Sequence, residues 1–328
     1  MGGTTDTPAT ASDRGWWRGR AWRLAGALVG CVLLGAAARA VWMNADAFGR
    51  VRTGLGDAPW ASVALLAALP LVSWLLTTGV FVALFSARAR VGAADMAALV
   101  GSSWLLNYLP LSPGLVARVA YQKGAMGIPV RTSARVVVES IVAGLAGGAV
   151  LLAEIAGGAK VLGVALPAGA GGVLLCLGAL GLLGACARGR VPVLAAAGLL
   201  AVLLKYVDTL AWSLRYWTIF GVLGVPVSAS QAVAIALVAQ VSMLVPGLGN
   251  GLGLREWTVG LLASSLPAWW GAGEAGGWAA VGGAGPALAL ALAADLTLRV
   301  FEVGCAVVAG LWGGVRLARR RTGFVSRS

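Results

Sequence analysis

The sequence predicts an all-α polytopic membrane protein. Three observations support this prediction: 59% of the 328 residues are hydrophobic, only 11% are charged, and long apolar stretches recur along the whole chain. Soluble domains have about 25% charged residues, and a helix that crosses a bilayer needs about 20 predominantly apolar residues. We therefore expect six transmembrane helices and two re-entrant helical hairpins of opposite orientation, arranged as an inverted repeat.

Six apolar stretches are long enough to cross the membrane. From the N-terminus they are 22–43, 58–86, 136–156, 161–187, 192–220 and 286–315. Two more, 93–125 and 231–266, are interrupted midway by proline and glycine, in the sequences LPLSPG and VPGLGNGLG. Because proline breaks a helix, each interruption leaves two arms that are too short to span the bilayer. Each pair of arms is predicted to enter and leave by the same face.

The basic residues indicate an orientation for these segments. With the N-terminus in the cytoplasm, most Lys and Arg in the connecting segments fall on the cytoplasmic side, whereas Arg50, Arg52 and Lys160 fall outside. This asymmetry follows the positive-inside rule. The predicted organisation is a basic cytoplasmic tail at 1–21, a single transmembrane domain at 22–315 and a basic cytoplasmic tail at 316–328.

The residue inventory narrows the chemistry. The chain has no histidine, the usual general base and the commonest metal ligand. Its four cysteines stand singly in apolar segments, so no metal site and no cofactor are expected; they are Cys31, Cys176, Cys186 and Cys305. The formal charge of +13 is assigned to cytoplasmic loops and not to nucleic-acid binding.

The first apolar segment has an alternative interpretation. Arginines precede Leu28-Val29-Gly30-Cys31, which resembles a lipoprotein cleavage box, and alanines 36–38 resemble a signal-peptidase site. The apolar run continues well beyond Cys31 to Trp42, which favours an uncleaved first helix over cleavage or lipidation at Cys31.

The two interrupted segments belong to a repeated order of elements. Repeat A (58–156) and repeat B (192–315) each contain a span, an interrupted segment and a second span, in opposite orientations. Pro110 and Pro246 head matching interruptions, and Arg118 and Arg255 follow them. Inverted repeats with discontinuous helices are a design of secondary transporters, whose substrate site lies near the midplane. The plainer alternative is that the interruptions are ordinary loops between short helices.

Charged residues inside the apolar segments are the candidate site. Such residues must pair, line a cavity or lie near the interface. The predicted intramembrane network comprises Glu139, Asp208, Arg215, Asp295, Arg299 and Glu302. The spacing of Asp295, Arg299 and Glu302 places them on one helix face, and Lys205 shares a face with Asp208. Structural pairing between helices is the alternative, and Arg39 is expected to be a helix-end residue that reaches the interface.

Arg118, Arg255 and Glu256 are the sharper candidates. Each interruption is followed by a half-helix, whose N-terminal N–H groups and dipole favour an anion. An arginine one turn further adds a charge and a bidentate fork suited to phosphate. The alternative is that Arg255 and Glu256 tie the hairpin to neighbouring helices.

Two stretches, 106–140 and 245–263, together with the helix 289–311, resemble the transmembrane-region family of lysylphosphatidylglycerol synthase. The matching positions are Asn107, Pro110, Gly114 and Arg118 in the first half, Glu139 at the next helix, and Pro246, Gly251, Gly253, Arg255 and Glu256 in the second half. Asn250 replaces a glycine of the family pattern, and Ser140 and Ala143 stand where polar partners of Glu139 are expected. The soluble synthase half of that family is not found in this chain.

The resemblance implies a flippase-like transporter that moves an anionic phospholipid or a lipid-linked phosphate, with membrane lipids as partners. Two alternatives remain open. One is a membrane-embedded enzyme that acts on a lipid headgroup, with Glu139 or Glu256 as base. The other is a non-catalytic subunit of a membrane transferase. The high alanine, glycine and arginine content with few lysines points to a bacterial source and therefore to the cytoplasmic membrane.

Overall fold

The computed structural model describes residues 28–109, 113–155, 160–161, 164–165, 170–189, 192–225, 227–245, 249–270, 281 and 284–325. Pro110 and Pro246 lie outside these ranges. The regular secondary structure of the described residues is helical, apart from two strands of two residues each, β1 (Lys160–Val161) and β2 (Val164–Ala165), which pair antiparallel. The prediction of an all-α protein is confirmed at this level.

The described part of the chain begins with a helix at Leu28–Trp42, which is bent by 83° from the helix that follows. The further helices are α2 (Ala45–Asp57), α3 (Trp60–Ser86), α4 (Ala93–Leu106), α5 (Pro113–Met126), α6 (Val130–Ile155), α7 (Ala170–Ala187), α8 (Val193–Val222), α9 (Ala229–Ser242), the short 3-10 helix η1 (Gly249–Gly251), α10 (Leu254–Trp270) and α12 (Ala284–Val325). Helix α2 was not expected, and α12 continues far into the segment 316–328 that the sequence analysis treats as a tail.

Within the described ranges, three helices are long and apolar enough to cross a membrane: α3, α6 and α8. The bent pair at the N-terminus would add a fourth if it forms one span. The outer surface agrees with a lipid environment, since Leu177 and Leu180 of α7 are 60% and 66% exposed and Val300 of α12 is 71% exposed. Water would make such exposure unfavourable. The apolar helices therefore indicate an integral membrane protein.

Local sequence signals set several helix ends. Asn44 caps α2, because its side chain accepts a hydrogen bond from the N–H of Ala47 at 3.2 Å. Ser228 and Gln231 form a reciprocal capping box at the start of α9. Gly224 lies just beyond the end of α8, and its φ of 73° lets the N–H of Val225 donate back to the carbonyl of Phe220. Cap and turn residues thus fix both ends of the α8–α9 connection.

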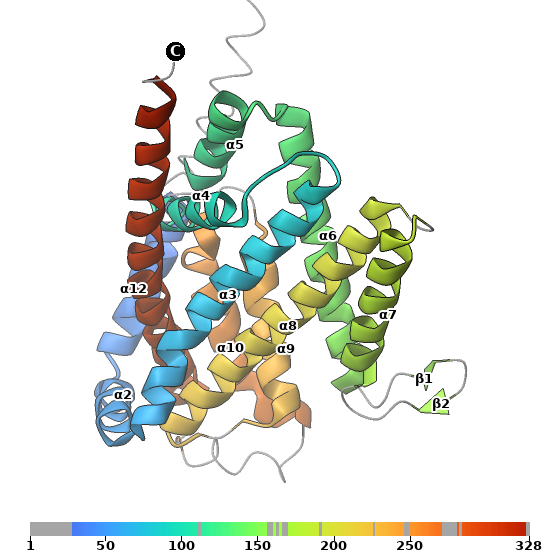
Figure 1. The fold of residues 1–328 in the computed structure, drawn as a ribbon. Coiled ribbons are helices and arrows are strands. Elements are labelled where there is room, and N and C mark those ends of the chain that lie inside the picture. Colours follow the sequence, from blue (N-terminus) through green and yellow to red (C-terminus); the bar gives the residue numbers. More distant parts are fainter. Residues whose placement is uncertain are drawn as a thin grey trace, which may run out of the picture.

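The same order of elements occurs twice. A long helix, two short helices and a long helix follow one another as α3, α4, α5 and α6, and again as α8, α9, α10 and α12. Figure 1 shows that α3 and α8 run in opposite directions along the molecule, and so do α6 and α12. Helices α4 and α5 lie at the end where α12 terminates, whereas the outer ends of α9 and α10 lie at the opposite end.

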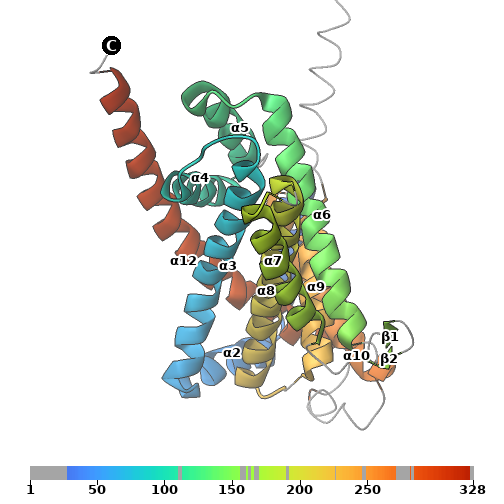
Figure 2. The ribbon, with the colours of Figure 1, turned by 45° about the vertical axis from the view of Figure 1, so that its right-hand side comes forward.

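Helix α4 lies across the bundle in both views and does not run along it (Figure 1, Figure 2). It packs closely on α12, because a Cβ placed on Gly313 would stand only 2.3 Å from the carbonyl oxygen of Ala98. Small residues commonly permit such approaches between membrane helices. The main buried apolar cluster lies elsewhere, among α8, α9, α10 and α12, and includes Tyr216, Phe220 and Leu290.

Candidate functional site

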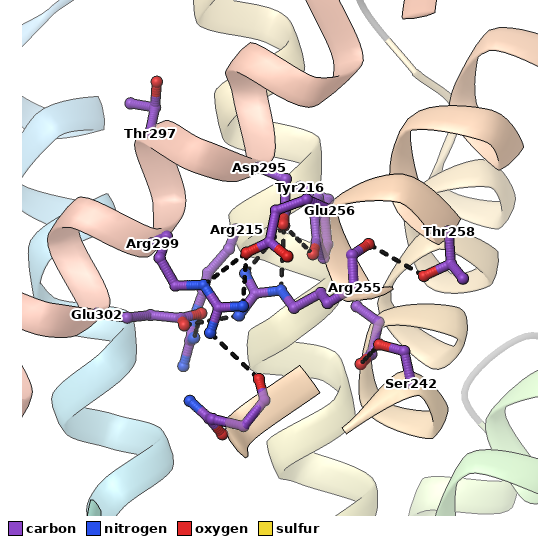
Figure 3. Close-up of polar contacts among 12 residues, drawn as sticks. Arg215, Tyr216, Ser242, Arg255, Glu256, Thr258, Asp295, Thr297, Arg299 and Glu302 are labelled. Atoms are coloured by element: carbon purple, nitrogen blue, oxygen red, sulfur yellow. Dashed lines mark hydrogen bonds and ion pairs between the residues drawn. The ribbon is translucent and has the colours of Figure 1, made fainter. Parts of the chain in front are cut away.

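A network of six charged residues lies inside the bundle (Figure 3). Helix α8 contributes Arg215, α10 contributes Arg255 and Glu256, and α12 contributes Asp295, Arg299 and Glu302. All six are buried, and Arg255, Glu256 and Asp295 have no exposed surface. Three guanidinium groups face three carboxylates, so the network is formally neutral. This balance is what permits so many charges away from water.

Arg255 occupies the centre of the network. Its Nη2 and Nε donate to Oδ1 of Asp295 at 2.9 and 3.2 Å, and its Nη1 donates to Oε2 of Glu302 at 2.7 Å. The hydroxyl of Tyr216 donates to the same Oδ1 of Asp295 at 2.6 Å. The guanidinium of Arg255 is therefore held by two carboxylates of α12.

Arg215 joins the network to α3. Its Nη1 donates to Oε1 of Glu302 at 3.1 Å, and its Nη2 donates to the carbonyl of Leu69 at 3.0 Å and to the hydroxyl of Ser73. The Trp212 ring lies 4.6 Å from the Arg215 guanidinium and 4.9 Å from that of Arg255. An aromatic face offers a cation further stabilisation where water is excluded.

Arg299 fixes the turn that precedes α10. Its Nε and Nη2 donate to Oε1 of Glu256 at 2.8 and 2.5 Å, and its Nη1 donates to the backbone carbonyl of Asn250 at 3.2 Å. The turn needs unusual backbone conformations, since Asn250, Gly251 and Gly253 all have positive φ. A Cβ on Gly253 would also stand 2.4 Å from Cβ of Leu33, so this turn packs directly on the first helix.

A cavity of about 520 Å³ lies beside the network. Its wall includes Asn107 and Arg118, on either side of the first interruption, and Met243, Leu244 and Asn250, which flank the second. The two interruptions thus face one cavity. Helices α3, α6 and α8 complete the wall, with Ser73, Ser140, Lys205 and Asp208 among their polar contributions and with Arg215 and Glu302 at the border of the network.

Arg118 differs from the other cations on this wall. Lys205 pairs with Asp208 at 3.1 Å, and Arg215 pairs with Glu302. Arg118 is half-buried and lies over the Phe81 ring at 4.2 Å, and no hydrogen bond or ion pair joins it to the described residues. Charge pairing within the described wall therefore leaves one positive charge unmatched.

Several buried polar atoms on the wall also lack partners among the described residues. They are Oδ1 of Asn107, Oδ1 of Asp208, Nε of Arg215 and Nε2 of Gln240. Buried polar groups are normally hydrogen-bonded, so such a cluster requires an explanation. The combination of an unmatched guanidinium with unpartnered amide and carboxylate atoms is suited to a polar ligand that carries an anionic group.

The structure separates the predicted headgroup residues into two groups. Asn107 and Arg118 line the cavity, whereas Arg255 and Glu256 lie in the buried network and not on the cavity wall. The glycines serve the backbone: a Cβ on Gly114 would stand 2.0 Å from the carbonyl of Ser103, and Gly251 and Gly253 allow the turn before α10. Pro110 and Pro246 lie outside the described residues.

Most of the predicted charge network is assembled as one unit, with two differences. Asp295, Arg299 and Glu302 do share one face of α12, as their spacing indicates. Glu139 does not join them, because Arg88 at 2.6 Å and Arg135 at 3.0 Å hold its carboxylate near the start of α6. Asp208 pairs with Lys205 on the cavity wall and makes no direct contact with the six residues among the described interactions.

Sequence reasoning missed four aromatic and hydroxyl residues of the site. Tyr216, Trp212 and Ser73 contact the arginines or Asp295 as described above, and the Tyr108 hydroxyl lies 3.4 Å from Oε2 of Glu302. Tyr108 also brings the first interruption against the network, since the Arg299 guanidinium lies 5.8 Å from its ring. Trp212 stands one helical turn before Arg215, and this spacing could have indicated that the two side chains share a helix face.

Among the described residues, no group of three or more Cys, Asp or Glu could hold a metal ion. Comparison with known proteins returned no matching family model, no matching curated protein and no matching solved structure.

Proposed function

We propose that this protein is a flippase-like membrane transporter that moves an anionic phospholipid or a lipid-linked phosphate across the bacterial cytoplasmic membrane. The observation that supports this proposal most strongly is the shared cavity, which both interruptions line and which contains the unmatched Arg118. A guanidinium presents paired N–H donors that match phosphate oxygens. The family resemblance of residues 106–140 and 245–263 points to the same class of substrate.

The helix directions support an inverted repeat for this transporter. In Figure 1, each long helix of the second set runs opposite to its counterpart in the first. We propose six spans, formed by the first helix, α3, α6, α7, α8 and α12, with α4–α5 and α9–α10 as hairpins that approach the cavity from opposite leaflets. A site between opposed interruptions can be reached from each side in turn when one repeat moves against the other.

The distribution of basic residues supports cytoplasmic termini. The ends of α3 and α5, the start of α6, the α7–α8 connection and the end of α12 all lie at one end of the molecule (Figure 1). These segments carry Arg88, Lys123, Arg135, Arg188 and Arg320. Helix α2, with Arg50 and Arg52, lies at the other end. Under the positive-inside rule the first end faces the cytoplasm.

The test is translocation by purified protein in vesicles that contain a fluorescent anionic phospholipid, with the outer leaflet bleached chemically. Wild-type protein is expected to make the labelled lipid of the inner leaflet accessible. Arg118→Ala removes charge-assisted hydrogen bonds worth roughly 1.5–3 kcal/mol, so we expect its rate to fall by about 10-fold or more. Arg118→Lys keeps the charge without the planar fork and is expected to lie between the two.

Arg39→Ala is the matched control, because Arg39 is an exposed arginine on the first helix and does not line the cavity. It should translocate lipid at the wild-type rate. Equal rates for wild type, Arg118→Ala and protein-free vesicles would refute the transport proposal, and equal rates for wild type and Arg118→Ala alone would refute Arg118 as the headgroup site.

A further inference from the structure

The cavity has an apolar edge between α6 and α9. Its wall includes Leu145 and Ile141 of α6, which are 52% and 39% exposed, and Val241 and Leu244 near the end of α9, which are 52% and 43% exposed. Such large apolar side chains line the cavity and face the surroundings at the same time. In a membrane protein their outer side meets hydrocarbon, so this edge is a boundary between the cavity and the lipid.

Helices α6 and α9 are in contact beside the cavity. A Cβ on Gly148 would stand 2.7 Å from Cδ2 of Leu237, which marks their contact. The two helices run in opposite directions (Figure 1, Figure 2). Leu145 on α6 and Val241 on α9 therefore lie one helical turn from this contact. Ile141 and Leu244 lie one turn further in the same direction. We call these four residues the α6–α9 seam.

The wall also has polar residues outside the seam. Asn107 and Arg118 come from the first interruption, and Lys205 and Asp208 come from α8. The cavity of about 520 Å³ falls within the range of roughly 300–1,000 Å³ that encloses drug-sized ligands, which suits a headgroup but not a headgroup together with long acyl chains. A lipid whose phosphate reaches Arg118 must therefore leave its chains outside.

We propose that the α6–α9 seam is a lateral opening through which the acyl chains of a phosphate-bearing lipid remain in the bilayer while its headgroup occupies the cavity. This inference rests on the proposed transport function and adds the route and the position of the chains. Charge complementarity selects the orientation, since the phosphate pairs with the unmatched Arg118 and the chains contact the apolar residues of the seam. A free phosphate ester would share the headgroup contacts but would not need the seam.

The experiment closes the seam reversibly. Leu145→Cys and Val241→Cys are combined in a chain whose four native cysteines are replaced by alanine, and the pair is joined with a short reducible cross-linker. We expect lipid translocation to fall to the level of protein-free vesicles and to return after reduction. Binding of water-soluble glycerol phosphate, measured by calorimetry, should be unchanged by the cross-link, because it enters without chains.

Two single-site variants provide a matched steric comparison that does not depend on cross-linking. Leu145→Trp fills the seam, whereas Val142→Trp adds the same side chain to an exposed position of α6 that does not line the cavity. We expect Leu145→Trp to slow translocation and Val142→Trp to leave it unchanged. Unaltered translocation through a closed seam would overturn the lateral opening while leaving the transport function in place; absence of translocation in the uncross-linked protein would instead count against the proposed function.

Discussion

The two interrupted segments share a sequence pattern, yet their arginines have different surroundings. Arg255, after the second interruption, is fully buried and held by Asp295 and Glu302. Arg118, after the first, lies on the cavity wall, and no carboxylate of the described residues pairs with it. The difference shows that a proline break followed by arginine does not specify a ligand site by itself. Whether such a cation is paired depends on whether a neighbouring helix provides a carboxylate.

The largest expected effect on stability comes from replacing the buried arginine, Arg255. Arg255→Met should destabilise the protein by roughly 3–5 kcal/mol, because Asp295 and Glu302 would lose the main partner of their buried charges. The change in stability is measured by thermal unfolding in detergent, monitored as the loss of the helical circular dichroism signal. Arg39→Met, on the exposed face of the first helix, should stay within about 0.5 kcal/mol of wild type. Equal unfolding of the two variants would contradict the central place of Arg255.

The next effect concerns the close approach that shapes the first interruption. Gly114→Ala would put a Cβ 2.0 Å from the carbonyl of Ser103 and 2.4 Å from Oδ1 of Asn107, so α4 and α5 would have to separate. We expect a loss of roughly 1–3 kcal/mol, as for other overpacked sites. Gly124→Ala, in the same helix with no atom within 4 Å, is the control and should be neutral or slightly stabilising. If both variants behaved alike in unfolding, the α4–α5 contact would be wrongly placed.

The smallest effect on stability is expected at Arg118. Arg118→Met removes a half-buried cation that no described carboxylate balances, so stability should stay within about 0.5 kcal/mol of wild type or rise. The same variant should lose lipid translocation, which separates a ligand-binding role from a structural one. Chemical denaturation in mixed micelles gives the stability change. A loss comparable to that of Arg255→Met would show that Arg118 is a second structural arginine.

Local patterns explain which parts of the fold were predictable. The apolar lengths placed α3 and α8 closely, and the four- and three-residue spacing on α12 placed Asp295, Arg299 and Glu302 on one face. Helix α2 was missed because its 13 residues are too short and too polar for the span criterion, although Asn44 supplies its cap. The charged C-terminal segment was expected to end the last helix, but exposed arginines do not prevent a helix from continuing in water.

The sequence could not predict which arginine pairs with which carboxylate, because the pairing depends on contacts between distant segments. The sequence shows that Glu139, Glu256 and Glu302 lie in apolar stretches, but not that Arg88 approaches the first and Arg299 the second. Asn250 shows that this turn does not require glycine at every position, because asparagine adopts the positive φ of 51° there and its backbone carbonyl accepts a hydrogen bond from Arg299.

The division of the network among helices has a consequence for biogenesis. The carboxylates that hold Arg215 and Arg255 both come from α12, the last helix of the described chain. During synthesis the two arginines therefore enter the membrane region before their counter-charges exist, and they must stay near water or lipid phosphate until α12 arrives. Integration of this half of the protein can be completed only when the ribosome has delivered α12.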